Sequence, residues 1–183
     1  LLSMGLSLAG LRDKFLDAQA QGKCNWIMQN QPDIWKQTHK YLQVSGFINH
    51  RLTGTFADAT ASQIGHLPFD YKQQKWTGKW GLTRLIFPIP DEKLPRLAQP
   101  GEILGSITPD AERQTGLKTG IPVVACGSDK GCETLGAGVL DHDMVSLSFG
   151  TTATVQTATK KYFEAIPLMP PYPSPAKGFY NPE

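Results

Sequence analysis

Residues 119–138 read TGIPVVACGSDKGCETLGAG, and this stretch decides the fold class. Residues 121–126 form a continuous apolar run whose length is typical of a buried strand. Gly-Ser-Asp at 127–129 follows as a turn, and from 130 to 140 apolar residues recur at helical spacing. A buried strand that leads directly into a helix predicts an α/β fold.

Three glycines, Gly131, Gly136 and Gly138, interrupt this predicted helix. Each weakens a helix by about 1 kcal/mol relative to alanine. We expect close packing against a neighbour, or a need for motion, to offset that cost.

A hairpin is predicted on the C-terminal side. Val145, Leu147 and Phe149 alternate with two serines, which is the pattern of a half-buried strand. Gly150 would turn the chain, and the threonine-rich run 151–159 would return as the partner strand.

The first third of the sequence predicts helices. Residues 6–19 carry apolar side chains at helical spacing, and Gly22 ends the pattern. Pro32 suits the first position of a second helix. One face of that helix would carry Trp35, Thr38, Tyr41 and Leu42. A further helical pattern ends at Thr53-Gly54, and residues 23–31 are assigned to none of these helices.

A short helix is predicted before the deciding stretch. Thr108 is a suitable N-cap, Pro109 suits the first helical position and Gly116 would close the helix. The sequence therefore predicts helices, a strand, a turn, a helix and a hairpin, in that order.

Composition and charge exclude several classes of function. The 183 residues include 18 basic and 16 acidic side chains, a net charge of +2, so no strong field draws the chain to nucleic acid or to an acidic membrane. No apolar run approaches the ~18 residues of a spanning helix.

Cys24, Cys126 and Cys132 are odd in number and lie among apolar neighbours. They predict reduced packing cysteines, and hence a cytoplasmic protein without thiolate-bound metal.

Aromatic and basic residues alternate between 69 and 80. Such a pattern could stack single-stranded nucleic acid. The alternative is that amphipathic side chains cover a pair of helices, and the balanced charge favours that alternative.

Two places could carry chemistry. Asp129 lies at the carboxyl end of the predicted strand, where open α/β sheets bind ligands, although an N-cap role would also explain it. Ser148 to Thr152 (SFGTT) could hold phosphate oxygens with backbone N–H groups and hydroxyls, or could be an ordinary hairpin turn.

Taken together, these segments resemble the FGGY-type carbohydrate kinases, and the xylulokinase-like members in particular. The stretches that carry the resemblance, in chain order, are KCNWIMQNQPDIW (23–35), HKYLQVSGFINHRLTGTFADATAS (39–62), PGEILGSIT (100–108), the stretch 119–138 and VSLSFGTTA (145–153). Cys24 replaces a larger apolar residue of the family pattern, and Lys130 replaces the usual Gln or Asn.

The resemblance implies a two-domain fold of the actin and ribonuclease-H-like type, with sugar and ATP meeting between the domains. Residues 1–140 would belong to the N-terminal sugar-binding domain, and 141–183 would begin the C-terminal ATP-binding domain with its opening hairpin. The family's first phosphate turn and its adenosine site have no counterpart in the 183 residues, so we expect a central fragment that is inactive by itself.

The resemblance also implies roles for single residues. Asp129 aligns with the catalytic base, Lys130 with a residue that touches the sugar, and Gly150, Thr151 and Thr152 with a turn that binds ATP phosphates. The implied reaction is phosphorylation of a ketopentose such as xylulose, or of a related polyol, by ATP with Mg²⁺. The implied protein is cytoplasmic, has small-molecule partners only, and could form a homodimer.

Two rival functions remain at this point. The same fold could bind sugar or nucleotide without transferring phosphate, as a regulatory module. It could also be an actin-like ATPase that has no sugar substrate.

Overall fold

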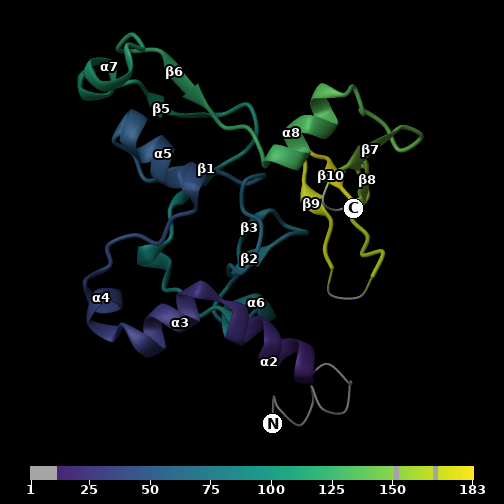
Figure 1. Cartoon of the computed structure of the whole chain (residues 1–183), viewed down its shortest axis with the longest axis horizontal. Coiled ribbons are helices and arrows are strands. Elements are labelled where there is room, and N and C mark those ends of the chain that lie inside the picture. The colour runs from purple at the N-terminus through teal and green to yellow at the C-terminus, as the bar shows by residue number, and fades with distance from the viewer. Residues whose placement is uncertain (1–11, 151–152, 167–168) are drawn as a thin grey trace. The chain divides into compact units, whose positions relative to one another are not determined.

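A computed structural model describes residues 12–150, 153–166 and 169–183 of the chain (Figure 1). The chain forms two compact units whose segments alternate along the sequence. A helical unit contains the N-terminal segment up to Tyr41 together with Gly65–Asp70 and Trp76–Leu94. A strand-rich unit contains Leu42–Ile64, Tyr71–Lys75 and Pro95–Glu183. The division at residue 140 predicted for the whole protein stays a prediction.

The helical unit consists mainly of short helices. Its elements are α2 (Arg12–Gln21), α3 (Lys23–Asn30), α4 (Pro32–Gln37), β2 (Phe69–Asp70), α6 (Leu82–Ile86) and the 3-10 helix η1 (Asp91–Lys93). Strand β3 (Lys75–Trp76) spans the sequence boundary between the two units.

A buried amide holds three helices of this unit together. Asn25 on α3 is 8% exposed, and its Nδ2 donates to the carbonyl oxygens of Gln19 at 2.9 Å and Ile86 at 3.0 Å. These bonds connect α3 to α2 and to α6. Gly22 lies where a Cβ would be 3.0 Å from the ring of Phe87, so the absence of a side chain permits this close packing.

The helix predictions for this unit are partly confirmed. α2 ends before Gly22, and Pro32 occupies the first turn of α4, as predicted. One helix was not assigned, and the extent of the second predicted helix is wrong. Residues 23–30 form α3, and α4 ends at Gln37 because the backbone of Thr38 is extended (ψ 117°). The chain beyond α4 is held by a hydrogen bond from the N–H of Tyr41 to the carbonyl of Lys93, at 2.7 Å, so Thr38 and Tyr41 share no helix face.

In its described residues, the strand-rich unit is built from paired strands and three helices. Its helices are α5 (Val44–Thr53), α7 (Pro109–Thr115) and α8 (Asp129–Gly136). Its strands are β1 (Ala57–Ala59), β4 (Arg96–Ala98), β5 (Ile103–Ser106), β6 (Pro122–Val124), β7 (Val145–Phe149), β8 (Ala153–Thr157), β9 (Tyr172–Pro173) and β10 (Tyr180–Asn181). The pairs β5–β6, β7–β8 and β9–β10 are antiparallel, and β1 and β4 are parallel.

Small residues make the core of this unit. A buried cluster consists of Ala57, Ala59, Ala98, Leu104 and Ala125, with Val123 packed against it. α5 approaches β1 closely, because a Cβ at Gly46 would be 3.2 Å from Oδ2 of Asp58. α5 ends as predicted, with Gly54 in the left-handed conformation (φ 72°) that glycine adopts without strain.

α7 confirms its prediction in full. Thr108 Oγ1 accepts from the N–H of Ala111 at 3.2 Å, Pro109 begins the helix and Gly116 ends it with φ 79°. The prediction that 121–126 forms a continuously buried strand is wrong. Ile121 is 45% and Val124 49% exposed, and within β6 it is Val123 that packs against the buried cluster.

Within the described ranges, no helix has the length and apolar character needed to cross a membrane.

Candidate active site

The turn between β6 and α8 is held in place by the segment after β1, which is distant in the sequence. Gly127 forms a parallel bridge with Ala61, and the N–H of Ser128 donates to the carbonyl of Ala61 at 3.0 Å. A Cβ at Gly127 would lie 3.0 Å from Pro175, so the turn is also tightly packed. α8 therefore begins from an anchored position.

Ser128, and not Asp129, is the N-cap of α8. Ser128 has an extended backbone (φ −65°, ψ 162°), and its Oγ accepts from the N–H of Gly131 at 3.1 Å. The alternative interpretation of Asp129 as the cap is therefore wrong. The extended cap conformation falls on Ser128 because its N–H is bound to Ala61, and Asp129 becomes the first helical residue.

The Asp129 carboxylate is exposed. Its Oδ1 accepts from the backbone N–H of Lys130 at 2.8 Å, and within the described residues no hydrogen bond to its Oδ2 is found. A carboxylate in the first turn of a helix interacts favourably with the helix dipole. Asp129 is thus ionisable, oriented and accessible, which are the properties that a proton acceptor needs.

α8 is shorter than predicted, and the glycines in and after it differ in their surroundings and conformation. It ends at Gly136, and Gly138 takes the left-handed conformation (φ 82°) just beyond it. A Cβ at Gly131 would come within 2.9 Å of Pro175, which confirms close packing there. A Cβ at Gly136 would meet nothing within 4 Å, so the packing prediction is wrong at that position.

Lys130 joins α8 to the hairpin. Its Nζ lies 2.8 Å from Oε2 of Glu133 and 3.3 Å from Oγ of Ser148 on β7. The hydrogen bond to Glu133 raises the pKa of Lys130, so the side chain stays an ammonium. The amine is neither directed only to solvent nor buried.

A second contact joins α8 to the hairpin. Thr134 lies one helical turn after Lys130, and its Oγ1 donates to Oε1 of Gln156 on β8. Thr134 is 1% and Gln156 3% exposed, so this hydrogen bond is shielded from water. The sequence pattern named Ser148 only as part of the SFGTT turn and did not indicate Thr134 or Gln156, because both contacts join residues far apart in the chain.

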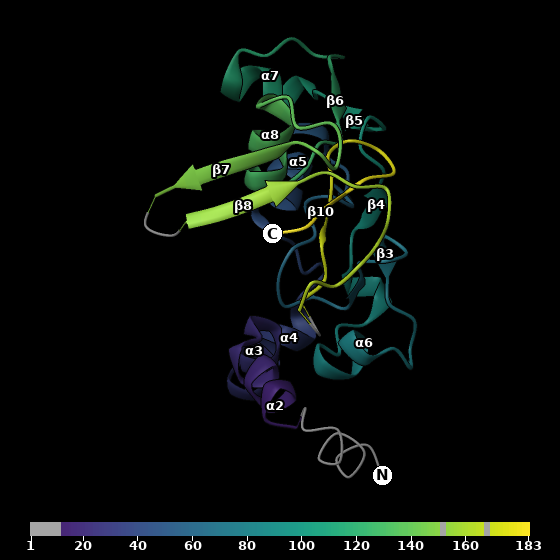
Figure 2. The same cartoon turned by 90° about the vertical axis from the view of Figure 1, so that its right-hand side faces the viewer.

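The predicted hairpin is confirmed, with a different exposed face. β7 and β8 pair in register from Val145↔Thr157 to Phe149↔Ala153, side by side in Figure 2. Gly150 directly follows β7 and is exposed, whereas Thr151 and Thr152 lie outside the described residues. The prediction that the apolar side chains are the half-buried ones is wrong. Leu147 is 56% exposed, and the intervening serines are less exposed because their face is the one turned toward α8.

The three cysteines differ in environment. Cys24 is fully buried, as predicted for a packing cysteine. Cys126 is exposed and Cys132 is partly exposed, and their Sγ atoms lie 3.4 Å apart. For these two the prediction of simple packing residues is wrong, because the turn at 127–131 brings the two sulfurs together.

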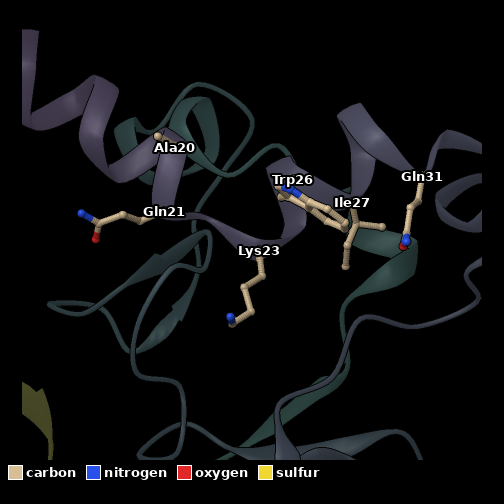
Figure 3. A pocket seen from close by; sticks show the side chains of 6 residues that line it. All are labelled: Ala20, Gln21, Lys23, Trp26, Ile27 and Gln31. Carbon is tan, nitrogen blue, oxygen red and sulfur yellow. The ribbon is translucent and has the colours of Figure 1, made fainter.

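The helical unit carries a separate hollow. It has a volume of ≈ 530 Å³ and lies along the end of α2 and the length of α3 (Figure 3). Its lining residues are Ala20, Gln21, Lys23, Trp26, Ile27 and Gln31. None of them is a predicted site residue. Within the described parts of the chain, no three His, Cys, Asp or Glu side chains gather as metal ligands.

The comparisons with known proteins agree with this architecture. Residues 17–136 match the N-terminal domain of the FGGY family of carbohydrate kinases. The chain belongs to this family, which confirms the resemblance.

Relatives of known sequence include sugar kinases. The uncharacterised sugar kinase YgcE of Escherichia coli K12 is 43% identical over 107 residues, which cover 58% of this chain and 22% of that protein. The L-fuculokinase of the same strain is 34% identical over 134 residues, covering 70% of this chain and 26% of that protein. The chain thus spans about a quarter of the curated relatives it matches.

Solved structures show the same fold. The xylulose kinase of Rhodospirillum rubrum matches with a TM-score of 0.76 and 23% identity, over 90% of this chain and 33% of that protein. The gluconate kinase of Lactobacillus acidophilus matches with a TM-score of 0.73 and 20% identity, over 98% of this chain and 38% of that protein. The mixed α/β class is confirmed.

Proposed function

We propose that the whole protein transfers the γ-phosphoryl group of MgATP to a hydroxyl of a small sugar, a ketopentose such as xylulose or a related polyol. Membership of the carbohydrate kinase family supports the reaction class. The observation that carries the proposal is the exposed Asp129 carboxylate at the start of α8, on the helix that contacts both strands of the 145–157 hairpin.

Asp129 is proposed as the general base. Ser128 satisfies the helix end, so the Asp129 carboxylate is available to a ligand. The bond from the Lys130 N–H restrains its orientation and leaves Oδ2 as the atom to accept the hydroxyl proton. In a loose phosphoryl-transfer transition state the base mainly orients the hydroxyl and takes its proton late, so an ordinary carboxylate suffices.

The turn after β7 is proposed to bind ATP phosphates through Gly150, Thr151 and Thr152. Backbone N–H groups and hydroxyls in such a turn stabilise charge on the phosphoryl oxygens. Two hydrogen bonds support coupling between this turn and the base, since Lys130 contacts β7 and Thr134 contacts β8.

Magnesium is proposed to arrive as part of the substrate. Mg²⁺ is usually held by one or two carboxylates together with substrate phosphates, not by a cage of protein ligands. The ion would neutralise charge on the transferred group.

The fold is proposed to be one part of a two-domain actin-like kinase divided near residue 140. Domain closure would exclude water that competes with the sugar as acceptor. Gly138, in the left-handed conformation between α8 and β7, suits a hinge at that division. The homodimer stays a prediction.

A sugar panel with the whole protein tests the proposal. ADP release should depend on added pentuloses, hexuloses or polyols, and the phosphorylated sugar should appear in equal amount. ATP turnover indifferent to every sugar would favour an actin-like ATPase instead. Binding of sugar or nucleotide without turnover would favour a regulatory module. The 183-residue chain alone should form no phosphorylated sugar.

A further inference from the structure

Cys126 and Cys132 form a close pair of thiols in the strand-rich unit. Cys126 lies between β6 and α8, and Cys132 lies one turn into α8. Their sulfur atoms are 3.4 Å apart. The sulfurs of a disulfide are about 2.05 Å apart, so a movement of little more than 1 Å would join them.

The surrounding contacts keep the two sulfurs together. Gly127 is bridged to Ala61, and Gly131 packs against Pro175. The five residues between the cysteines are therefore held at both ends, and the N–H of Cys132 donates to the carbonyl of Ser128 at 2.9 Å. The thiols approach each other as a consequence of this backbone geometry.

We propose that Cys126 and Cys132 are an oxidative modification site, at which a hydroperoxide produces an intramolecular disulfide. The inference does not depend on the proposed kinase activity. The oxidant is a small hydroperoxide, such as hydrogen peroxide, and a cellular thiol would reverse the reaction.

The reaction balances in two steps. The Cys126 sulfur attacks one peroxide oxygen, the O–O bond breaks, and the leaving hydroxide takes up the proton of the Cys126 thiol to give the first water and a sulfenic acid. The sulfur of Cys132 then attacks the Cys126 sulfur, the S–O bond breaks and a second water leaves. Two thiols lose two electrons in total, and the peroxide is reduced to two waters.

The different surroundings of Cys126 and Cys132 indicate which of the two reacts first. Cys126 is exposed, so a small oxidant reaches it first. Cys132 is only partly exposed, and burial, followed by the neighbouring Cys126 sulfur, raises the pKa of its thiol. The accessible Cys126 is therefore the residue that the oxidant modifies, and Cys132 is the resolving residue.

Cys24 provides an internal control. It is completely buried, and burial raises its pKa to about 11. It belongs to the helical unit, and its Sγ lies 3.7 Å from the Asn25 amide oxygen. We expect it to react at least ~10-fold more slowly than Cys126.

Mass spectrometry tests the proposal directly. Trypsin cleaves after Lys130, between the two cysteines, so peptides 119–130 and 131–160 separate unless a disulfide joins them. The whole protein, reduced, would be treated with stoichiometric hydrogen peroxide, alkylated with iodoacetamide and digested without reductant. The joined pair of peptides should dominate, and dithiothreitol should abolish it.

Two variants complete the experiment. Cys132→Ser should leave Cys126 as a sulfenic acid that dimedone traps, and Cys24→Ser should give the same joined peptides as the unaltered protein. The proposal is overturned if peptide 131–160 carries alkylated Cys132 after Cys126 has been oxidised. It is also overturned if Cys24 reacts as fast as Cys126.

Discussion

The backbone N–H of Ser128 donates to the carbonyl oxygen of Ala61, at 3.0 Å, and so ties the start of α8 to the segment after β1. That segment is organised by a buried carboxylate. Asp58 is 1% exposed, and its Oδ2 accepts from Ser45 Oγ at 2.7 Å and from Gln63 Nε2 at 2.9 Å. The position of Asp129 thus depends on a polar network that does not include it.

Replacing Asp58 by Asn should destabilise the strand-rich unit. Asp58 Oδ1 accepts from Asn49 Nδ2 at 3.1 Å, so both of its oxygens face donors. An amide nitrogen in place of one oxygen would oppose a donor and leave buried groups unpaired, at a cost of about 2–4 kcal/mol. Calorimetry should show Tm lowered by roughly 5–10 °C. The exposed Asp143→Asn is the matched control and should change Tm by less than about 2 °C.

Asp129→Asn in the whole protein should lower kcat by at least ~100-fold, the scale expected for loss of a general base. The fold should be kept, because Ser128 and not Asp129 caps the helix. Activity with the preferred sugar and thermal unfolding are the two measurements. A kcat near that of the unaltered protein would leave Asp129 with a structural role alone.

Ser128→Ala is the control for that variant. It removes the cap and should cost about 1 kcal/mol of stability, while the carboxylate of Asp129 remains. Loss of kcat with Ser128→Ala equal to that with Asp129→Asn would attribute both effects to disturbance of α8.

Thr134→Val should weaken the contact between α8 and the hairpin. Valine keeps the shape but cannot donate to Gln156, whose side chain is buried. An unpaired buried acceptor costs about 1–3 kcal/mol. We expect a lower Tm together with faster amide hydrogen exchange in β8, measured against Thr115→Val. The Thr115 hydroxyl donates to the Ala111 carbonyl in α7 and accepts from the N–H of Leu117 just beyond that helix. Equal exchange in β8 for both variants would contradict the contribution of the Thr134 hydrogen bond.

Local signals in the sequence predicted the elements that local contacts determine. α7 was predicted with both of its ends, because Thr108, Pro109 and Gly116 each act on their immediate neighbours. α3 was missed because its N-cap is Gly22, which forms no side-chain cap hydrogen bond and gives no start signal.

Long-range contacts account for the remaining errors. Ser128 and Asp129 are both good cap residues, and the choice between them follows from the carbonyl of Ala61, which no local pattern reveals. The alternation in β7 predicted two distinct faces correctly. Which face is covered is determined by Lys130 and Thr134 of α8, whose contacts with the hairpin the sequence pattern does not show.

Lys130→Gln tests the least expected residue of the candidate site. Lys130 offers donors only, whereas glutamine offers both a donor and an acceptor, so the two should favour different sugar oxygens and hydroxyls. We expect the ranking of sugars by kcat/KM to change, because a lost substrate contact appears as differential transition-state binding. The KM for ATP should stay within about a factor of five, ~1 kcal/mol.

A structural role for Lys130 predicts a different result. Its Nζ lies 3.3 Å from Ser148 Oγ, so Ser148→Ala removes that contact and keeps the ammonium. If Lys130 selects the sugar, Ser148→Ala should leave the ranking unchanged and Lys130→Gln should alter it. If Lys130 only links α8 to β7, both variants should lower stability and keep the same ranking. The sugar panel is measured for both variants and for the unaltered protein. It separates the two roles, because a contact that only links two elements cannot distinguish one sugar from another.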